Sequence, residues 1–73
     1  MLISGNIISK NHDGIIGISS IPVIENNEIV ENESNGILML NDCNVEIFQN
    51  KIQENKDAGL FLKNGSRGTV SKN

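Results

Sequence analysis

The sequence contains no Trp or Tyr, a single cysteine at Cys43, and no long run of apolar residues. One cysteine excludes an internal disulfide framework and a zinc site built from cysteines, and is typical of a reducing compartment. No stretch approaches the roughly 18 apolar residues of a membrane helix. The first ten residues lack the basic start and the apolar core of a signal peptide. We therefore expect an intracellular, cytoplasmic protein without a membrane segment.

Basic residues are also scarce. Six Lys and Arg stand against nine Asp and Glu, which gives a net charge of −3 and a pI of about 4.9. The basic residues are scattered along the chain, whereas binding to nucleic acid requires them to be clustered. Nucleic acid is therefore not expected as a partner, and the 73 residues allow one domain at most.

Asn and Ile dominate the residues that are present, with 12 of each. Ile is β-branched and favours strands. Asn favours turns and tolerates the left-handed backbone conformation. The composition therefore predicts many short strands separated by tight corners.

These residues recur with a fixed period. A first Asn returns after 21, 23 and 23 residues, at Asn6, Asn27, Asn50 and Asn73. A second Asn follows five positions later, at Asn11, Asn32 and Asn55. A Gly follows at Gly14, Gly36 and Gly59. Apolar residues keep the same phase, at Ile3, Ile24, Ile47 and Val70, at Ile8, Ile29 and Ile52, and at Ile15, Ile37 and Leu60.

The repeating unit I-x-x-N-x-I-x-x-N-x-x-x-G-I-x-L predicts one coil of a β-solenoid. Each copy has three short apolar segments separated by Asn or Gly, and no helical spacing of apolar residues is sustained. Strands of successive coils would stack in parallel about 4.8 Å apart, so that each position of the unit forms a row. The predicted fold is an all-β parallel β-helix of about three coils of 22–23 residues, at 1–20, 21–43 and 44–65, with a partial coil at 66–73.

The two Asn positions are expected to form structural ladders at the corners, Asn6, Asn27 and Asn50 in one and Asn11, Asn32 and Asn55 in the other. Each side chain would bond to its neighbours above and below and to local backbone groups. The Gly of each unit is expected either at positive φ or where a side chain would collide. Because neither end shows a capping helix, we expect a segment of a longer β-helix, or ends that something else covers.

The segments "IPVIENNEIVENESNGILML" (21–40) and "NGSRGTVSKN" (64–73) carry a family resemblance. The unit resembles the parallel β-helix repeats of the pectin-lyase-like superfamily, which contains polysaccharide lyases and hydrolases and a periplasmic copper-maturation group. The two segments are most similar to the alternating coils of F-box only proteins, the substrate receptors of a cullin-based ubiquitin ligase. The resemblance covers nearly the whole chain and implies a right-handed parallel β-helix. The chain contains no F-box, so recruitment of a ligase is not implied.

The enzymes of that superfamily carry clustered carboxylates with an Arg or Lys on the outer face of one sheet, and the rows here contain no such cluster. Asp13 and Asp57 fall in different rows without a second carboxylate, and His12 is a lone corner residue. Glu28 lies over Lys51, which indicates solvated charge rows of small energetic effect. Neither the paired carboxylates of glycoside chemistry nor converging calcium ligands are expected. We therefore predict no catalytic residue, no metal and no cofactor.

One outward row of apolar residues is predicted in the strand after each Gly, because side chains alternate along a strand. This row, the apolar stripe, consists of Ile16, Ile18, Leu38, Leu40 and Phe61. A stacked apolar row is typical of a covered or binding surface. It is expected to contact either a protein partner or another part of the same protein, such as further coils.

The predicted function is that of a non-catalytic scaffold for protein–protein interaction. It would serve as a substrate-recognition module or as a structural component of a larger intracellular assembly, such as the cytoskeleton. The alternative is a fragment of a carbohydrate-active domain, lyase-like or hydrolase-like, whose catalytic coils lie outside this chain. No small-molecule substrate is evident. An F-box or cytoskeletal context in a longer reading frame would favour the scaffold, and Asp-rich coils behind a signal peptide would favour the sugar enzyme.

Overall fold

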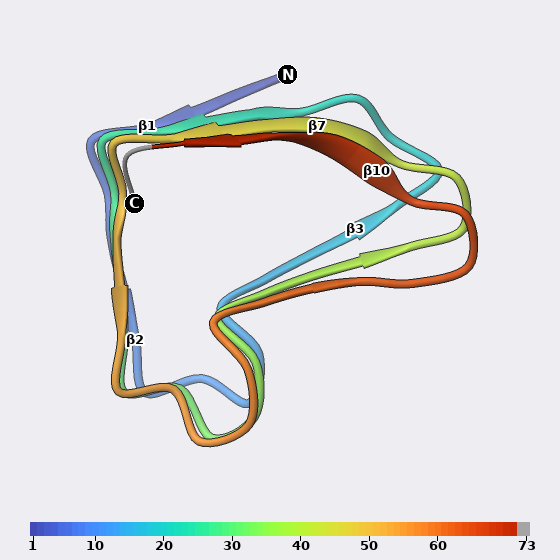
Figure 1. The fold of residues 1–73 in the computed structure, drawn as a ribbon. Helices are drawn as coiled ribbons and strands as arrows, with labels where there is room; N and C mark the ends of the chain where they lie inside the picture. The colour runs from blue at the N-terminus through green and yellow to red at the C-terminus, as the bar shows by residue number, and fades with distance from the viewer. Residues whose placement is uncertain (72–73) are drawn as a thin grey trace.

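Ten short strands and no helix make up the described part of the chain, residues 1–71, in a computed structural model (Figure 1). The strands are β1(Leu2–Ser4), β2(Ile7–Ser9), β3(Ile15–Ile18), β4(Val23–Glu25), β5(Glu28–Val30), β6(Ile37–Leu40), β7(Asn44–Phe48), β8(Lys51–Gln53), β9(Leu60–Leu62) and β10(Arg67–Ser71). No helix long and apolar enough to span a bilayer is found among these residues. The predicted all-β fold is confirmed.

The strands form three parallel sheets, each built from one strand per coil. Sheet A has the order β1-β4-β7-β10, sheet B the order β2-β5-β8, and sheet C the order β3-β6-β9. The register joins Ile3 to Ile24, Ile24 to Ile47 and Ile47 to Val70, and it places Ile29 beside Ile52. Seen along the stack, the coils superpose, with sheets A, B and C on three different sides (Figure 1). Residues one repeat apart are therefore direct neighbours.

The core lies inside the coils and is concentrated in the middle of the stack. The fully buried apolar residues are Ile24, Ile29, Ile37, Met39, Cys43, Val45 and Ile47. Ile3, Ile8, Ile15, Ile52, Leu60 and Leu62 pack against them and are partly buried. This distribution follows from the architecture, since each coil of a solenoid contacts only the coils next to it.

Both corners beside sheet B turn through a residue of positive φ placed directly before the ladder Asn. These residues are Gly5, Asn26 and Gln49 before the first ladder and Lys10, Glu31 and Glu54 before the second. The left-handed conformation is costly for residues other than Gly and Asn. The hydrogen bonds of the following Asn hold the corner in place and offset that cost.

The Gly of the first and second units is required by space and not by its backbone conformation. A Cβ on Gly14 would lie 2.5 Å from the carbonyl oxygen of Gly36, and one on Gly36 would lie 2.6 Å from that of Gly59. None of these three glycines has a positive φ. Of the two reasons expected from the sequence, collision is therefore the one that applies.

Candidate binding face

The outer face of sheet C carries the apolar stripe. Strands β3, β6 and β9 pair in register, so that Ile16, Leu38 and Phe61 form one row across three coils and Ile18 and Leu40 form a second. Ile16, Ile18 and Phe61 are 54%, 60% and 43% exposed, and the two Leu side chains are half-buried. The five residues therefore lie together on one surface.

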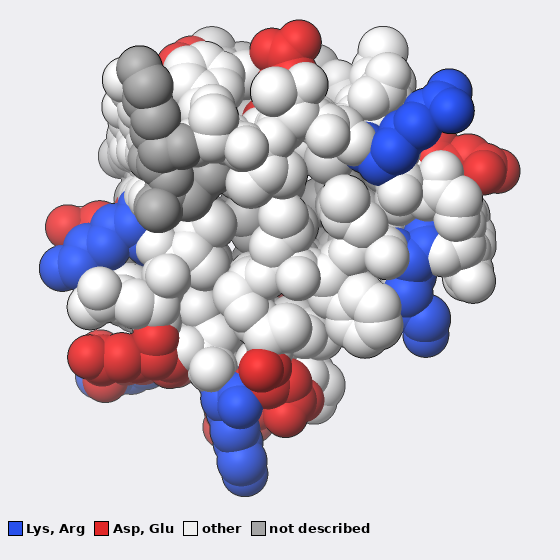
Figure 2. Space-filling view, in the orientation of Figure 1, with Lys and Arg blue, Asp and Glu red and all other residues white. Residues whose placement is uncertain are grey.

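The outer faces of the other two sheets are different in kind. The corresponding row on sheet B consists of Ile7, Glu28 and Lys51, and sheet A carries glutamates among its outward residues. Charged side chains lie around the outline of the molecule in the view along the stack (Figure 2). At the end of sheet C, the Lys63 ammonium lies 5.8 Å from the centre of the Phe61 ring. The uncharged face is thus restricted to one side of the coil.

Glu28 lies beside Lys51 in the register, as expected, but the two do not form an ion pair. Among residues 1–71, the contact of this kind that is found is between His12 Nδ1 and Asp13 Oδ2, 3.1 Å apart, and it is an ion pair only when the imidazole is protonated. Exposed charges that are not in contact contribute little to stability. The charged rows therefore serve as a solvated surface.

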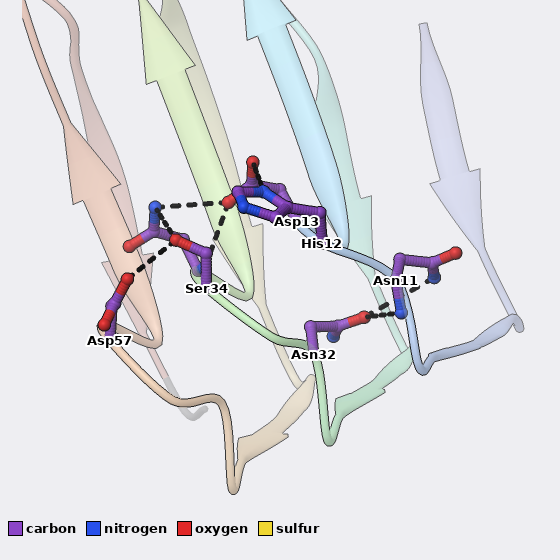
Figure 3. A network of polar contacts seen from close by, with 7 residues as sticks. Asn11, His12, Asp13, Asn32, Ser34 and Asp57 are labelled. Atoms are coloured by element: carbon purple, nitrogen blue, oxygen red, sulfur yellow. Dashed lines mark hydrogen bonds and ion pairs between the residues drawn. The ribbon is translucent and has the colours of Figure 1, made fainter.

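A network of polar side chains occupies the corner between sheets B and C, and successive coils contribute to it (Figure 3). This polar corner consists of His12, Asp13, Ser34, Asn35 and Asp57. Ser34 Oγ donates to Asp57 Oδ2 at 2.7 Å, and Asn35 Nδ2 donates to Ser34 Oγ at 3.4 Å. The polar corner thus brings together two carboxylates, a hydroxyl and an imidazole.

Asp13 holds the second coil at this corner. Its Oδ1 accepts the backbone N–H of Asn35 at 3.0 Å and the Nδ2 of Asn35 at 3.2 Å. The hydrogen bond from the Asn35 backbone and that with the His12 side chain keep the pKa of Asp13 below its ordinary value. A carboxylate held ionised in this way is poorly suited to act as a general acid near neutral pH.

The Asn ladders use the same double hydrogen bond in the opposite direction along the stack. Asn27 Oδ1 accepts the backbone N–H and the Nδ2 of Asn6 at 3.0 and 3.1 Å, and Asn27 donates the same two groups to Asn50 Oδ1 at 3.0 Å each. Its Nδ2 also donates to the carbonyl oxygens of Ile3 and Glu25. In the ladders, therefore, each coil donates to the next coil, whereas Asp13 accepts from it.

The second ladder repeats this arrangement, from Asn11 to Asn32 and from Asn32 to Asn55. Asn27 and Asn32 are only 3% and 2% exposed. Within residues 1–71, no buried side-chain nitrogen or oxygen lacks a hydrogen bond. The amides of the buried ladder residues Asn27 and Asn32 are therefore committed to the fold.

Cys43 is buried and 1% exposed. Its Sγ lies 3.2 Å from the carbonyl oxygen of Leu40 and 3.6 Å from Ser20 Oγ. Burial raises the pKa of the Cys43 thiol, hydrogen bonds with Ser20 and Ser66 lower it, and the net shift is downward. Because solvent does not reach the sulfur, Cys43 acts as a small core residue.

A hollow of about 220 Å³ opens beside Gly17 in the first coil. Its lining includes Met1, Ile3 and Ile15, and Ser20 is its one residue with a polar side chain. Met39 occupies the space of the missing side chain, since a Cβ on Gly17 would lie 2.5 Å from the Met39 Sδ. Ligand sites combine apolar walls with several convergent polar groups, and this hollow does not.

The polar corner was not predicted as a unit. The rows of the sequence place His12, Ser34 and Asp57 one above another, and this alignment was the available signal. The rows also place Asn35 over Asp13, and that contact spans one repeat of 22 residues. The contacts that join neighbouring rows, between His12 and Asp13 and between Asn35 and Ser34, have no period of their own and were missed. No group of three His, Cys, Asp or Glu side chains within residues 1–71 is placed to hold a metal ion.

The family model described as "Right handed beta helix region" matches residues 1–73. This chain therefore belongs to the right-handed β-helix family, and the predicted fold class is confirmed. No curated protein and no solved structure shows significant similarity to it. The similarity to F-box only proteins consequently rests on the sequence pattern alone.

Proposed function

We propose that this chain is a non-catalytic β-helix scaffold that binds protein through the outer face of sheet C. The observation that carries this proposal is the apolar stripe, in which Ile16, Leu38 and Phe61 stand in register across three coils. The inward rows already form the core, so the stripe is surplus to the packing of the coils themselves. Covering it would gain about 25 cal/mol for each Å² of apolar surface removed from water.

The rigidity of the sheet supports a role in recognition. Three strands joined by parallel hydrogen bonds hold the stripe residues at a spacing of about 4.8 Å from coil to coil. A surface that is ordered before binding loses little conformational entropy when a partner arrives. The partner would be another protein or a further part of the same protein. The scaffold would act as a substrate-recognition module or as part of a larger intracellular assembly.

The alternative of a sugar-active domain finds less support in the polar corner. Asp13 uses one carboxylate oxygen to hold Asn35 and the other to contact His12. Asp57 accepts the hydroxyl of Ser34. These contacts give the carboxylates a structural role, and we therefore propose that residues 1–73 contribute no catalytic group.

The double variant Leu38→Ser with Phe61→Ser tests the binding face. Ile7→Ser is the matched control, because Ile7 is an outward apolar residue of sheet B and is 74% exposed. Association would be measured by light scattering of the purified chain and by pull-down from its native source. We expect the double variant to weaken association at least about tenfold, as for apolar anchors of an interface, and the control to leave it unchanged. Thermal unfolding would verify that both variants are folded, and unchanged association in the double variant would refute the proposal.

A further inference from the structure

We infer that Asn64–Gly65 is a site of spontaneous deamidation, whereas Asn35–Gly36 is protected from the same reaction by the fold. These are the two places in the chain where Gly follows Asn. In such a pair the backbone nitrogen of Gly can reach the side-chain amide of Asn, because Gly has no side chain to hinder the approach. The two pairs have the same chemistry, so any difference between them reports on structure.

The reaction needs only water. The Gly65 nitrogen forms a bond to Cγ of Asn64, the bond between Cγ and Nδ2 breaks, and ammonia leaves with the proton of the Gly65 N–H. Water then opens the resulting cyclic imide at either carbonyl. The products carry aspartate or isoaspartate at position 64, and no oxidant, metal or enzyme takes part.

Asn64 and Gly65 form the centre of an exposed turn with φ values of 52° and 80°. The turn is closed by a hydrogen bond of 3.2 Å from the Ser66 N–H to the carbonyl oxygen of Lys63. The attacking Gly65 N–H has no hydrogen-bond partner among residues 1–71. The side chain of Asn64 makes an exposed contact of 3.2 Å from its Nδ2 to Asn41 Oδ1. The Asn64 carbonyl oxygen accepts the N–H of Asp42 at 3.0 Å. Both turn residues are exposed, so the local opening that brings nitrogen and Cγ together has a low cost.

Asn35 and Gly36 are both buried in the middle coil. The Gly36 N–H donates to the carbonyl oxygen of Ala58 at 2.8 Å, which ties the nucleophile to the next coil. The Asn35 amide donates to Asp13 in the coil before. Attack at Asn35 therefore requires separation of the coils, which costs much of the free energy of unfolding.

Deamidation at position 64 would alter the approach to the last strand. A carboxylate there cannot donate to Asn41 Oδ1, and it would lie near Asp42, whose Oδ1 is 2.5 Å from the position of a Cβ on Gly65. An isoaspartate also adds an atom to the backbone of the turn before β10. We expect faster hydrogen exchange of the first amides of β10, beginning with that of Arg67, which donates to the carbonyl oxygen of Cys43.

The test is to incubate the purified full chain at mildly alkaline pH and follow both peptides by mass spectrometry. We expect Asn64 to react at least about tenfold faster than Asn35 in the folded chain, and the two rates to converge in denaturing guanidinium chloride. Asn64→Gly is the control, because it removes the reacting amide and tolerates the positive φ. Equal rates in the folded chain would overturn the inference. So would an unreactive Asn64 under conditions in which the unfolded chain reacts at both sites.

Discussion

The middle coil and its two neighbours use the same residue types in the same places, yet the shared rows of sheet B and of the first Asn ladder are buried most fully in the middle coil. In the third coil, Val45 and Ile47 are fully buried where β10 pairs with β7. Ile8, Ile29 and Ile52 form one row of sheet B, and Ile29 alone in that row is fully buried. In the first Asn ladder, Asn6 is exposed and Asn27 is 3% exposed. For side chains of the same type that point inward, burial in this molecule therefore depends on having a coil on each side. Stability should accordingly be a sum over neighbouring coils.

The largest expected effect comes from truncating the Ile row. Ile29→Ala should lower the free energy of unfolding by about 3–4 kcal/mol, because it leaves a cavity enclosed on both sides. Ile8→Ala and Ile52→Ala should cost about half as much, because these side chains are already partly exposed and the site can collapse. Urea unfolding measures all three.

If Ile29→Ala does not fold, Ile29→Val can be compared with Ile52→Val. Ile29→Val should lower the free energy of unfolding by about 1 kcal/mol, and Ile52→Val by less. Equal costs at positions 29 and 52 would show that the coil position does not matter.

The Asn ladder should show the same gradient. Asn27→Ala removes the partner of Asn6 and Asn50 inside the stack and should cost about 2–3 kcal/mol, because it leaves buried donors and acceptors unpaired. Asn6→Ala leaves its partners at an exposed corner and should cost about 1 kcal/mol or less. Denaturant unfolding of the two single variants measures both losses of stability. A difference between them no larger than the error of the method would contradict the prediction.

The glycine row shows how the space available for a side chain differs from one coil to the next. Gly36→Ala should destabilise the protein by about 2 kcal/mol, because the new Cβ would lie 2.6 Å from the carbonyl oxygen of Gly59. Gly59→Ala meets only Ile52 Cγ2 at 3.1 Å and should change stability by less than about 0.5 kcal/mol, helped by the lower entropy of the unfolded chain. Thermal unfolding of both variants is sufficient, and a larger loss for Gly59→Ala would contradict the structure.

Substitution of Asp13 should have a small effect on stability, and this effect should depend on pH. Its pKa is lowered in the folded chain, so its contribution is present above the pKa of the unfolded state, near 3.8, and is lost as the pH falls through the lower folded pKa. Asp13→Asn should therefore cost about 1 kcal/mol or less at neutral pH, and the difference from the unmodified chain should shrink below about pH 4. Unfolding curves between pH 7 and pH 3 measure this, and a difference that stays constant would contradict it.

The period, the three sheets and the membership of each row could be predicted from the sequence because every column repeats. The register of Ile24, Ile29 and Ile37 with their counterparts one coil later needs no information beyond the spacing. The position of the apolar stripe followed from alternation along β3, β6 and β9 in the same way. A periodic pattern thus predicts which residues of adjacent coils are paired.

The direction of hydrogen bonds and the cause of each corner could not be predicted. Asp13 accepts from the coil after it, whereas the ladder Asn residues accept from the coil before. Both kinds of contact link residues one repeat apart, so the period alone does not distinguish their directions. The residues of positive φ vary too much in type for a pattern, since Gln49 and Glu54 serve as well as Asn26. The composition predicted tight corners but did not indicate which residue of each corner adopts a positive φ.

Coil length is free to vary while the register holds. The step from Ile3 to Ile24 is 21 residues and that from Ile24 to Ile47 is 23, yet both pairs meet in sheet A. The surplus residues of the longer coil are accommodated in the segments between sheets, outside the paired strands. The stretch between β6 and β7, which includes exposed Asn41 and Asp42, is therefore a natural point for grafting a foreign peptide, because the inserted loop would bulge outward and leave the layers above and below undisturbed.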